Sequence, residues 1–205
     1  MGQVIAMRAI PGSGKSTLAK QLINKTKEEG KTAVICSADD YFVELGKGTY
    51  KFDPSKISEA HKACFKKFMH AITSGIDLII VDNTNLSAWE LSPYKTYAEA
   101  NDYDFAINEV VADPAEAFKR QHHGVPQRGM EFMHNRFNQE FIPPWWEKKR
   151  MISKTNEAGE PAFEEEVIEE SPQLDLPFPK KPTKESSASL NRLFRTASKI
   201  ERKYS

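Results

Sequence analysis

The residues from Ala9 to Thr17, Ala-Ile-Pro-Gly-Ser-Gly-Lys-Ser-Thr, have the types and spacing of a loop that binds phosphate groups. An apolar run at residues 4–7 precedes this loop and a helical pattern begins at Leu18, which is the strand–loop–helix context of a P-loop. The glycines let successive backbone N–H groups point into one concave site, to which the helix start adds positive charge. Ala9 replaces the motif's first glycine. The loop predicts a nucleoside triphosphate held by Pro11, Gly12, Ser13, Gly14, Lys15, Ser16 and Thr17.

A lysine, a hydroxyl and a carboxylate supply the further groups that triphosphate chemistry needs. Lys15 is placed to reach the β- and γ-phosphates, and the Ser16 hydroxyl is placed to bind Mg²⁺. The apolar residues 78–81 run into Asp82, which is the layout of a Walker B strand whose carboxylate holds Mg²⁺ through water. An ordinary turn residue at a strand end is the alternative for Asp82. ATP and Mg²⁺ are therefore the expected cofactors.

A pair of carboxylates, Asp39 and Asp40, follows the apolar run at residues 32–36. The ligand crevice of a parallel sheet lies at the carboxyl ends of its strands, so one of these aspartates is expected to face the terminal phosphate. A carboxylate there accepts the proton of an attacking hydroxyl, as a kinase base does. A helix cap or turn is the alternative for the pair.

Residues 3–150 alternate between strand and helix patterns. The expected strands are 3–8, 32–36, 78–81 and 105–112; the expected helices are 15–28, 54–74, 88–100, one that starts at Asp113-Pro114, and 130–140; residues 38–50 are expected as a loop. Alternation with short connections predicts an α/β P-loop NTPase domain over residues 1–150, with a parallel sheet covered by helices on both faces.

Beyond residue 150 the composition changes. Glu, Pro and Ser dominate residues 155–186, which predicts disorder there and a flexible tail over 151–205. The chain as a whole has 29 basic and 29 acidic residues, but residues 157–175 contain eight acidic and no basic ones. Residues 180–205 contain eight basic and two acidic ones, with a short amphipathic helix pattern at 190–200. Such blocks of one charge sign often serve as interaction tails.

Cysteine content and hydropathy indicate in which cellular compartment the protein is expected. Cys36 and Cys64 both lie in apolar patterns, so they are interpreted as buried hydrophobic residues and not as a disulfide. No stretch is apolar enough to span a membrane, and no signal peptide precedes the first strand. A cytoplasmic protein without a membrane partner is expected.

Four motifs occur in an order that resembles the polynucleotide 5′-kinase-like group of P-loop kinases. They are Pro-Gly-Ser-Gly-Lys-Ser-Thr (11–17), Ser-Ala-Asp-Asp-Tyr-Phe (37–42), Tyr-Lys-Phe-Asp-Pro with Glu-Ala-His (50–61), and Val-Asp-Asn-Thr-Asn (81–85). The resemblance covers residues 3–142. It implies a kinase that transfers the γ-phosphate of ATP to a 5′-hydroxyl of DNA or RNA, as in the repair of nucleic acid ends.

The resemblance also implies roles for individual residues. Asp39 is implied as the general base, and Lys15 and Ser16 as contacts of phosphate and Mg²⁺. The segment 119–126 is similar to the family's lid, which makes Arg120 the best candidate to stabilise transition-state charge. Arg128 and Arg136 are further candidates. A solvated arginine on a charged helix is the alternative for Arg120.

Recognition of the acceptor departs from the family pattern. Phe42 stands where the phage enzyme of this family has an arginine that holds nucleic acid, which leaves acceptor recognition open, with stacking of a base on Phe42 or Tyr41 as one option. His61 is expected to be partly buried and not catalytic. Three lysines of the same helix either line an acceptor groove or form a solvated face: Lys62, Lys66 and Lys67.

Two other functions are compatible with the sequence. The first is a P-loop kinase that acts on a small molecule such as a nucleotide or sugar, which the departure at Phe42 favours. The second is an ATP-binding accessory module of replication or repair. Residues 173–178, Gln-Leu-Asp-Leu-Pro-Phe, resemble the peptide that docks bacterial proteins on the sliding clamp, with Gln173, Leu174, Leu176 and Phe178 as anchors. A proline-rich linker is the alternative for this peptide.

Overall fold

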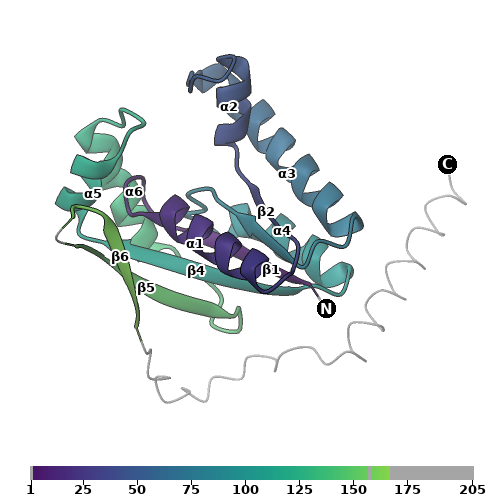
Figure 1. The fold of residues 1–205 in the computed structure, drawn as a ribbon. Coiled ribbons are helices and arrows are strands. Elements are labelled where there is room, and N and C mark those ends of the chain that lie inside the picture. The colour runs from purple at the N-terminus through teal and green to yellow at the C-terminus, as the bar shows by residue number, and fades with distance from the viewer. Residues whose placement is uncertain (1, 157, 167–205) are drawn as a thin grey trace, which may run out of the picture. The chain divides into compact units, whose positions relative to one another are not determined.

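A six-stranded sheet forms the centre of the computed structural model, which describes residues 2–156 and 158–166 (Figure 1). The strand order is β2-β3-β1-β4-β5-β6, parallel except for the antiparallel pair β5–β6. The strands are β1 (Gln3–Arg8), β2 (Ala33–Cys36), β3 (Leu78–Val81), β4 (Asp104–Ala112), β5 (Lys148–Thr155) and β6 (Pro161–Glu166). The helices are α1 (Lys15–Glu28), α2 (Asp39–Leu45), α3 (Ile57–Thr73), α4 (Ala88–Ala100), α5 (Pro114–Arg120) and α6 (Gln127–Gln139), with a short 3₁₀ helix at Pro54–Lys56.

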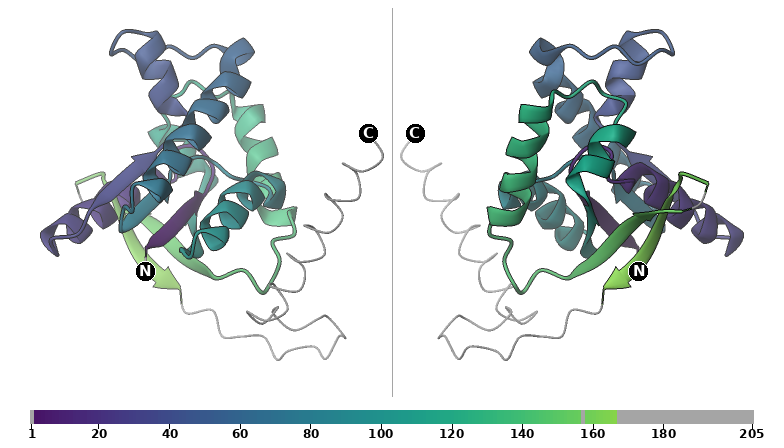
Figure 2. Two further views of the ribbon diagram at one scale, coloured as in Figure 1. Left: turned by 90° about the vertical axis from the view of Figure 1, so that its right-hand side faces the viewer. Right: turned by 90° about the vertical axis from the view of Figure 1, so that its left-hand side faces the viewer.

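Helices cover both faces of the sheet, as the sequence predicts. Strand side chains alternate between faces, so Val4 and Ala6 of β1 face a core shared with α3 and α4, whereas Ile5 and Met7 face α1. The turned views show α1 and α4 on opposite sides of the sheet (Figure 2). This confirms the expected P-loop α/β architecture.

Local capping signals explain where several helices start. The Asp53 carboxylate accepts a hydrogen bond from the Ser55 N–H at 2.9 Å, and Pro54 follows it as the first residue of the 3₁₀ turn. Asp113 accepts from the N–H of Ala115 and Glu116 before α5 in the same way. At α4 the carboxylate of Glu90 accepts from the Ser87 N–H at 2.8 Å. The predicted starts are therefore confirmed.

The ordered sheet continues past residue 150, which corrects the expected end of the domain at residue 150 and the expected disorder for residues 155–156 and 158–166. Strand β5 pairs with β4, and β6 returns beside β5. The acidic block supplies cross-strand ion pairs: Lys154–Glu164 at 2.6 Å, Lys149–Glu165 at 3.4 Å and Arg150–Glu166 at 3.4 Å. Opposite charges across a strand pair are stabilising, so composition typical of a solvated tail forms a hairpin here.

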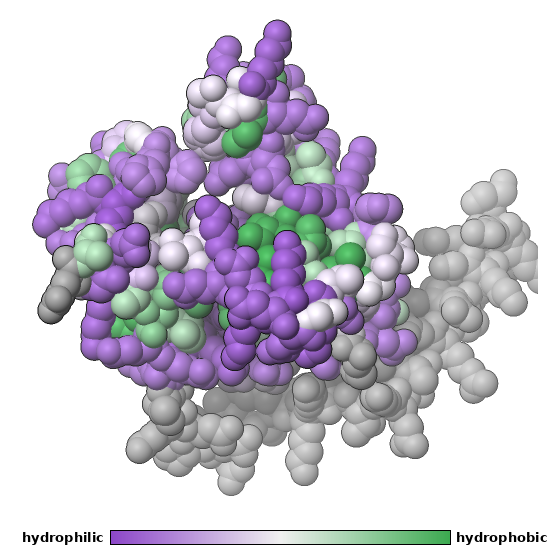
Figure 3. All heavy atoms as spheres, viewed as in Figure 1, coloured by the Kyte–Doolittle hydropathy of each residue, from purple (hydrophilic) through white to green (hydrophobic). Residues whose placement is uncertain are grey.

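The structure also corrects the loop that is expected over residues 38–50. Residues 39–45 of this segment form helix α2. The tail features expected at 173–178 and 190–200 lie outside the described residues. Within the described part of the chain, no helix is both long and apolar enough to cross a membrane. The face that carries α1 and β2 is mostly hydrophilic around a central group of hydrophobic residues (Figure 3).

Candidate active site

The P-loop joins β1 to α1 through two glycines with positive φ, Gly12 at +75° and Gly14 at +93°. This backbone conformation is one that side chains other than glycine rarely adopt. Gly14 is also the N-cap of α1, and its carbonyl accepts from the N–H of Thr17 and Leu18. The loop is closely packed on both sides. A Cβ on Gly12 would overlap the carbonyl oxygen of Ala117 in α5, and one on Gly14 would lie 2.9 Å from Pro161 in β6.

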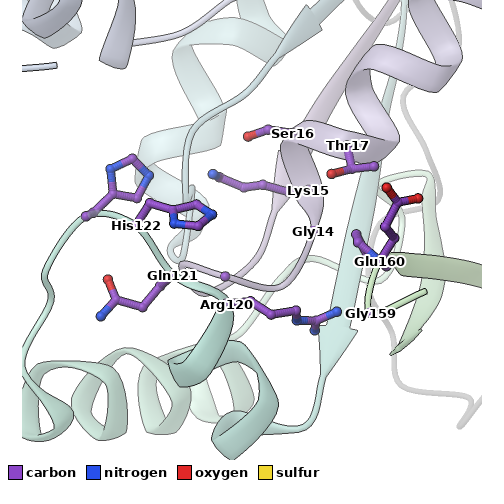
Figure 4. Close-up of a pocket in the computed structure, with 12 residues that line it drawn as sticks. Gly14, Lys15, Ser16, Thr17, Arg120, Gln121, His122, Gly159 and Glu160 are labelled. Carbon is purple, nitrogen blue, oxygen red and sulfur yellow. The ribbon is translucent and has the colours of Figure 1, made fainter. Parts of the chain in front are cut away.

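A pocket of about 370 Å³ opens beside the P-loop (Figure 4). Three segments form it: the P-loop residues Gly12 and 14–17, the lid residues 120–123 and the hairpin residues 159–161. Two of the expected phosphate contacts do not line this pocket with their side chains: Pro11 lines a neighbouring pocket, and the Ser13 side chain is fully buried with its Oγ unpartnered. The pocket thus combines a helix N-terminus with basic lid side chains, a combination suited to an anionic ligand.

Lys15 and Asp82 meet behind the P-loop, with Lys15 Nζ and Asp82 Oδ1 3.6 Å apart and both side chains buried. Asp82 Oδ1 has no hydrogen-bond partner in the described structure. A buried carboxylate oxygen without a hydrogen bond, beside Lys15 and so near the next P-loop residue Ser16, fits a hard cation such as Mg²⁺. No cluster of three or more His, Cys, Asp or Glu occurs among residues 2–156 and 158–166, so protein groups alone do not make a metal cage there.

A second pocket of about 240 Å³ contains Asp39 and shares Lys15 and His123 with the first. The Tyr50 hydroxyl donates a hydrogen bond to Asp39 Oδ1 at 3.2 Å, and His123 Nε2 lies 3.9 Å from Asp39 Oδ2. Burial, helped by the charge of Asp39 and this hydrogen bond, raises the pKa of Tyr50 to about 12. Tyr50 therefore stays a hydrogen-bond donor at neutral pH.

The structure separates the two neighbouring aspartates. Asp40 turns away from the pocket and pairs with Lys67 of α3 at 2.7 Å. Asp39 lies in the pocket beside Lys15, and the Ser37 hydroxyl accepts from its N–H at 3.2 Å. Of the pair, Asp39 is the carboxylate placed next to the P-loop.

Two expectations about the acceptor side are wrong. Phe42 was expected to be available for stacking on a base, but it is 3 % exposed and packs edge-on against Tyr41 and Tyr50. The Tyr41 hydroxyl is engaged by Glu59 at 2.7 Å. His61 was expected to be partly buried, but it is exposed and lines the Asp39 pocket, because the buried stripe of α3 passes through its neighbour Ala60.

Arg120 lines the phosphate pocket, but its side chain runs away from Lys15 toward Gly159 and Glu160 (Figure 4). Its Nη1 lies 3.5 Å from the Ser153 hydroxyl of β5, while its Nε and Nη2 are buried without a partner. The other candidate arginines lie outside both pockets: Arg128 is exposed, and Arg136 Nε lies 4.0 Å from Glu140.

Some lining residues were not singled out from the sequence. His122 and His123 belong to the predicted lid segment, yet only the fold shows that His123 reaches Asp39. The hairpin residues 159–161 were assigned to the tail. A turn signal was present: Asn156 Oδ1 accepts from the Glu160 N–H at 2.8 Å, and Gly159 has a φ of +80°.

An AAA domain family model matches residues 4–137, and the chain belongs to this family. Human NEDD4-binding protein 2 is 37 % identical over 126 residues, which are 60 % of this chain and 7 % of that protein. The match therefore spans only a small part of that relative.

Solved structures share the fold at low identity. A chain of the Pnkp1/Rnl/Hen1 RNA repair complex matches with a TM-score of 0.55 and 19 % identity, covering 67 % of this chain and 44 % of that one. The Mycobacterium tuberculosis APS kinase CysC, solved with AMPPNP and APS, matches with a TM-score of 0.52 and 19 % identity, covering 74 % and 88 %. The chain has the P-loop kinase fold that the motif resemblance implied.

Proposed function

We propose that this domain is an ATP-dependent kinase that transfers the γ-phosphoryl group to the 5′-hydroxyl of a polynucleotide. The position of Asp39 supports this best, because its pocket shares Lys15 and His123 with the phosphate pocket. A hydroxyl bound beside Asp39 would face a phosphate held by the P-loop. A carboxylate in a pocket that adjoins the phosphate pocket is the arrangement that phosphoryl transfer to an alcohol requires.

Asp39 acts in this proposal as the general base. Tyr50 occupies Oδ1 of the carboxylate, which leaves Oδ2 for the acceptor hydroxyl. As the acceptor oxygen bonds to the γ-phosphorus, its proton passes to Asp39, and the bond from the γ-phosphorus to the bridging oxygen breaks to release ADP. A positioned base contributes about 10²- to 10⁴-fold to such a step.

The phosphate side is proposed to depend on Lys15, Ser16 and Asp82. Lys15 exchanges its contact with Asp82 for the β- and γ-phosphates. The Ser16 hydroxyl and the Asp82 carboxylate would hold Mg²⁺, which neutralises phosphate charge when it is bound. Arg120 lines the phosphate pocket, and two of its guanidinium nitrogens have no hydrogen-bond partner. We propose that its side chain turns from its place beside Gly159 and Glu160 to pair with a phosphate of the bound nucleotide.

A small-molecule acceptor is the second candidate. The family's acceptor-binding arginine is replaced by the buried Phe42, and one matched structure, the APS kinase, was solved with the small molecule APS. Both candidate functions need an acceptor hydroxyl in the Asp39 pocket. They differ only in whether a polynucleotide chain continues from the residue that carries this hydroxyl.

Transfer of labelled γ-phosphate in one competition assay separates these candidates. The purified chain would receive Mg²⁺-ATP with 5′-hydroxyl DNA and RNA oligonucleotides, nucleoside monophosphates and sugars. Label on the oligonucleotides supports the proposal, and label only on small molecules supports the alternative. Transfer to none of these acceptors would reject the kinase function.

Docking of residues 173–178 on a sliding clamp stays a separate proposal, which would tether the kinase to DNA. Retention of the whole chain on immobilised clamp, and its loss in the double variant Gln173→Ala and Phe178→Ala, would support the docking. No retention of the unchanged chain would end it.

A further inference from the structure

A second groove, of about 630 Å³, runs between α3 and α4 next to the Asp39 pocket. Its walls are rich in aromatic and apolar side chains, including Phe65, Met69, Pro93 and Tyr94. Trp89, in the first turn of α4, lines the groove with 67 % of its surface exposed. A large ring left this exposed beside an apolar groove offers a flat stacking surface.

Basic side chains of α3 line the same groove: His61, Lys62 and Lys66. Two other lysines of this region are neutralised, since Lys56 pairs with Glu59 and Lys67 pairs with Asp40. Within the described part of the chain, Lys62 and Lys66 have no ion-pair partner.

One carboxylate lines the groove, and it already accepts a hydrogen bond from the backbone. Glu90 is the carboxylate that lines it, and this carboxylate accepts the N–H of Ser87 at the start of α4. Two lysines against one carboxylate give the groove lining a net positive formal charge beside its aromatic walls. This combination suits a polyanion that carries planar groups.

The groove is continuous with the acceptor side of the candidate active site. Ile57 and His61 line both the groove and the Asp39 pocket. A molecule whose hydroxyl lies at Asp39 and which is longer than that pocket would pass His61 and enter the groove. A small acceptor would end before it.

We propose that this groove binds the nucleotides that follow the 5′-terminal one in a single-stranded acceptor, with a base on Trp89 and phosphates near Lys62 and Lys66. The proposal rests on the proposed kinase function and names the site that would make the acceptor a polynucleotide. The groove lining combines an exposed aromatic ring with two lysines, which are the kinds of group that bind bases and phosphates of a single strand. Loss of one base–aromatic stack weakens single-strand binding about 5- to 150-fold.

The test measures binding and transfer in parallel on the full chain. Fluorescence anisotropy would follow a labelled single-stranded 5′-hydroxyl oligonucleotide of about ten nucleotides, a length within the usual range of such sites. Phosphate transfer would be measured to this oligonucleotide and to a nucleoside 3′-phosphate, which lacks the following nucleotides that the proposal places in the groove. Trp89→Ala is expected to weaken oligonucleotide binding about tenfold or more and to leave transfer to the nucleoside 3′-phosphate unchanged.

The lysines have their own readout. Lys62→Ala with Lys66→Ala is expected to reduce the slope of log Kd against log salt by about 1.4, because each phosphate contact to a single strand contributes about 0.7. Matched controls are Trp145→Ala, an exposed tryptophan outside the groove, and Lys20→Glu on α1. Both controls should bind like the unchanged chain.

The outcomes separate the groove from the reaction. The proposal is overturned if the unchanged chain does not bind the oligonucleotide, or if the groove variants bind it as tightly as the unchanged chain does. Either result would also be expected if the groove bound an apolar protein segment instead. An equal loss of transfer to both acceptors in Trp89→Ala overturns it too, because the tryptophan would then support the domain as a whole. If the unchanged chain phosphorylates neither acceptor, the proposed function fails, whereas selective loss of oligonucleotide binding in the variants would still support the groove.

Discussion

The Tyr50 hydroxyl donates a hydrogen bond to Asp39 Oδ1 at 3.2 Å, from the segment that follows helix α2 in the chain. This contact fixes one carboxylate oxygen and leaves the other in the pocket that Lys15 also lines. The neighbouring Asp40 has no such position, because it pairs with Lys67 on the surface. Two adjacent aspartates therefore differ in chemistry because of what surrounds them.

Replacement of the proposed base should abolish turnover without abolishing nucleotide binding. Asp39→Asn keeps the size of the side chain but accepts no proton, so we expect kcat to fall about 10²- to 10⁴-fold. The dissociation constant of ATP should change little, because the phosphate pocket does not include Asp39. Asp40→Asn is the matched control and should retain activity. Equal activity of Asp39→Asn and the unchanged chain would contradict the assignment.

Tyr50 should contribute to the loss of stability at high pH. Its folded pKa, raised to about 12, lies above the ordinary value of 10.0, so between these values the unfolded chain releases a proton that the folded chain keeps. The unfolded state then binds fewer protons, and the free energy of unfolding falls as pH rises. Urea unfolding at about pH 9 and pH 11 should show a smaller fall for Tyr50→Phe than for the unchanged chain. An identical fall would contradict the raised pKa.

The close approach of the P-loop to α5 should make Gly12 sensitive to substitution. Gly12→Ala adds a Cβ that overlaps the Ala117 carbonyl at a position with φ +75°. Gly75→Ala is a matched control, since Gly75 has a φ of +71° but open space around it. The control should lose about 1–2 kcal/mol of stability through backbone strain alone. Gly12→Ala should lose more and should also lose nucleotide affinity, measured by unfolding and by ADP titration; equal effects at both positions would contradict the packing argument.

Local signals predicted much of this fold. The bounds of α1 follow from apolar periodicity and flanking glycines, and those of β3 follow from a continuous apolar run. The starts at Asp53 and Asp113 follow from cap residues. These signals are short-range, so a single sequence displays them. The Asp39 environment is different, because Tyr50 and His123 come to it from distant segments.

The hairpin β5–β6 was missed for a related reason. Its acidic strand has few apolar residues, and its order comes from pairing with basic residues of β5 and from the packing of Phe163 near the α1 core. Neither partner is visible from composition. Charge that lies opposite its complement stabilises a strand pair, whereas the same charge read along the chain indicates a solvated tail.

The hairpin should therefore matter to both stability and nucleotide binding. A chain that ends at Arg150 lacks Ser153, which contacts Arg120, and lacks Pro161 and Phe163, which pack against Gly14. Loss of these partly buried side chains and of the strand pairing should lower the free energy of unfolding by about 3 kcal/mol or more. A chain that ends at Glu166 keeps every described strand and should match the full chain in urea unfolding and in ADP affinity. If the chain ending at Arg150 were as stable and bound ADP as tightly as the chain ending at Glu166, the hairpin would contribute neither to the stability of the domain nor to the nucleotide pocket.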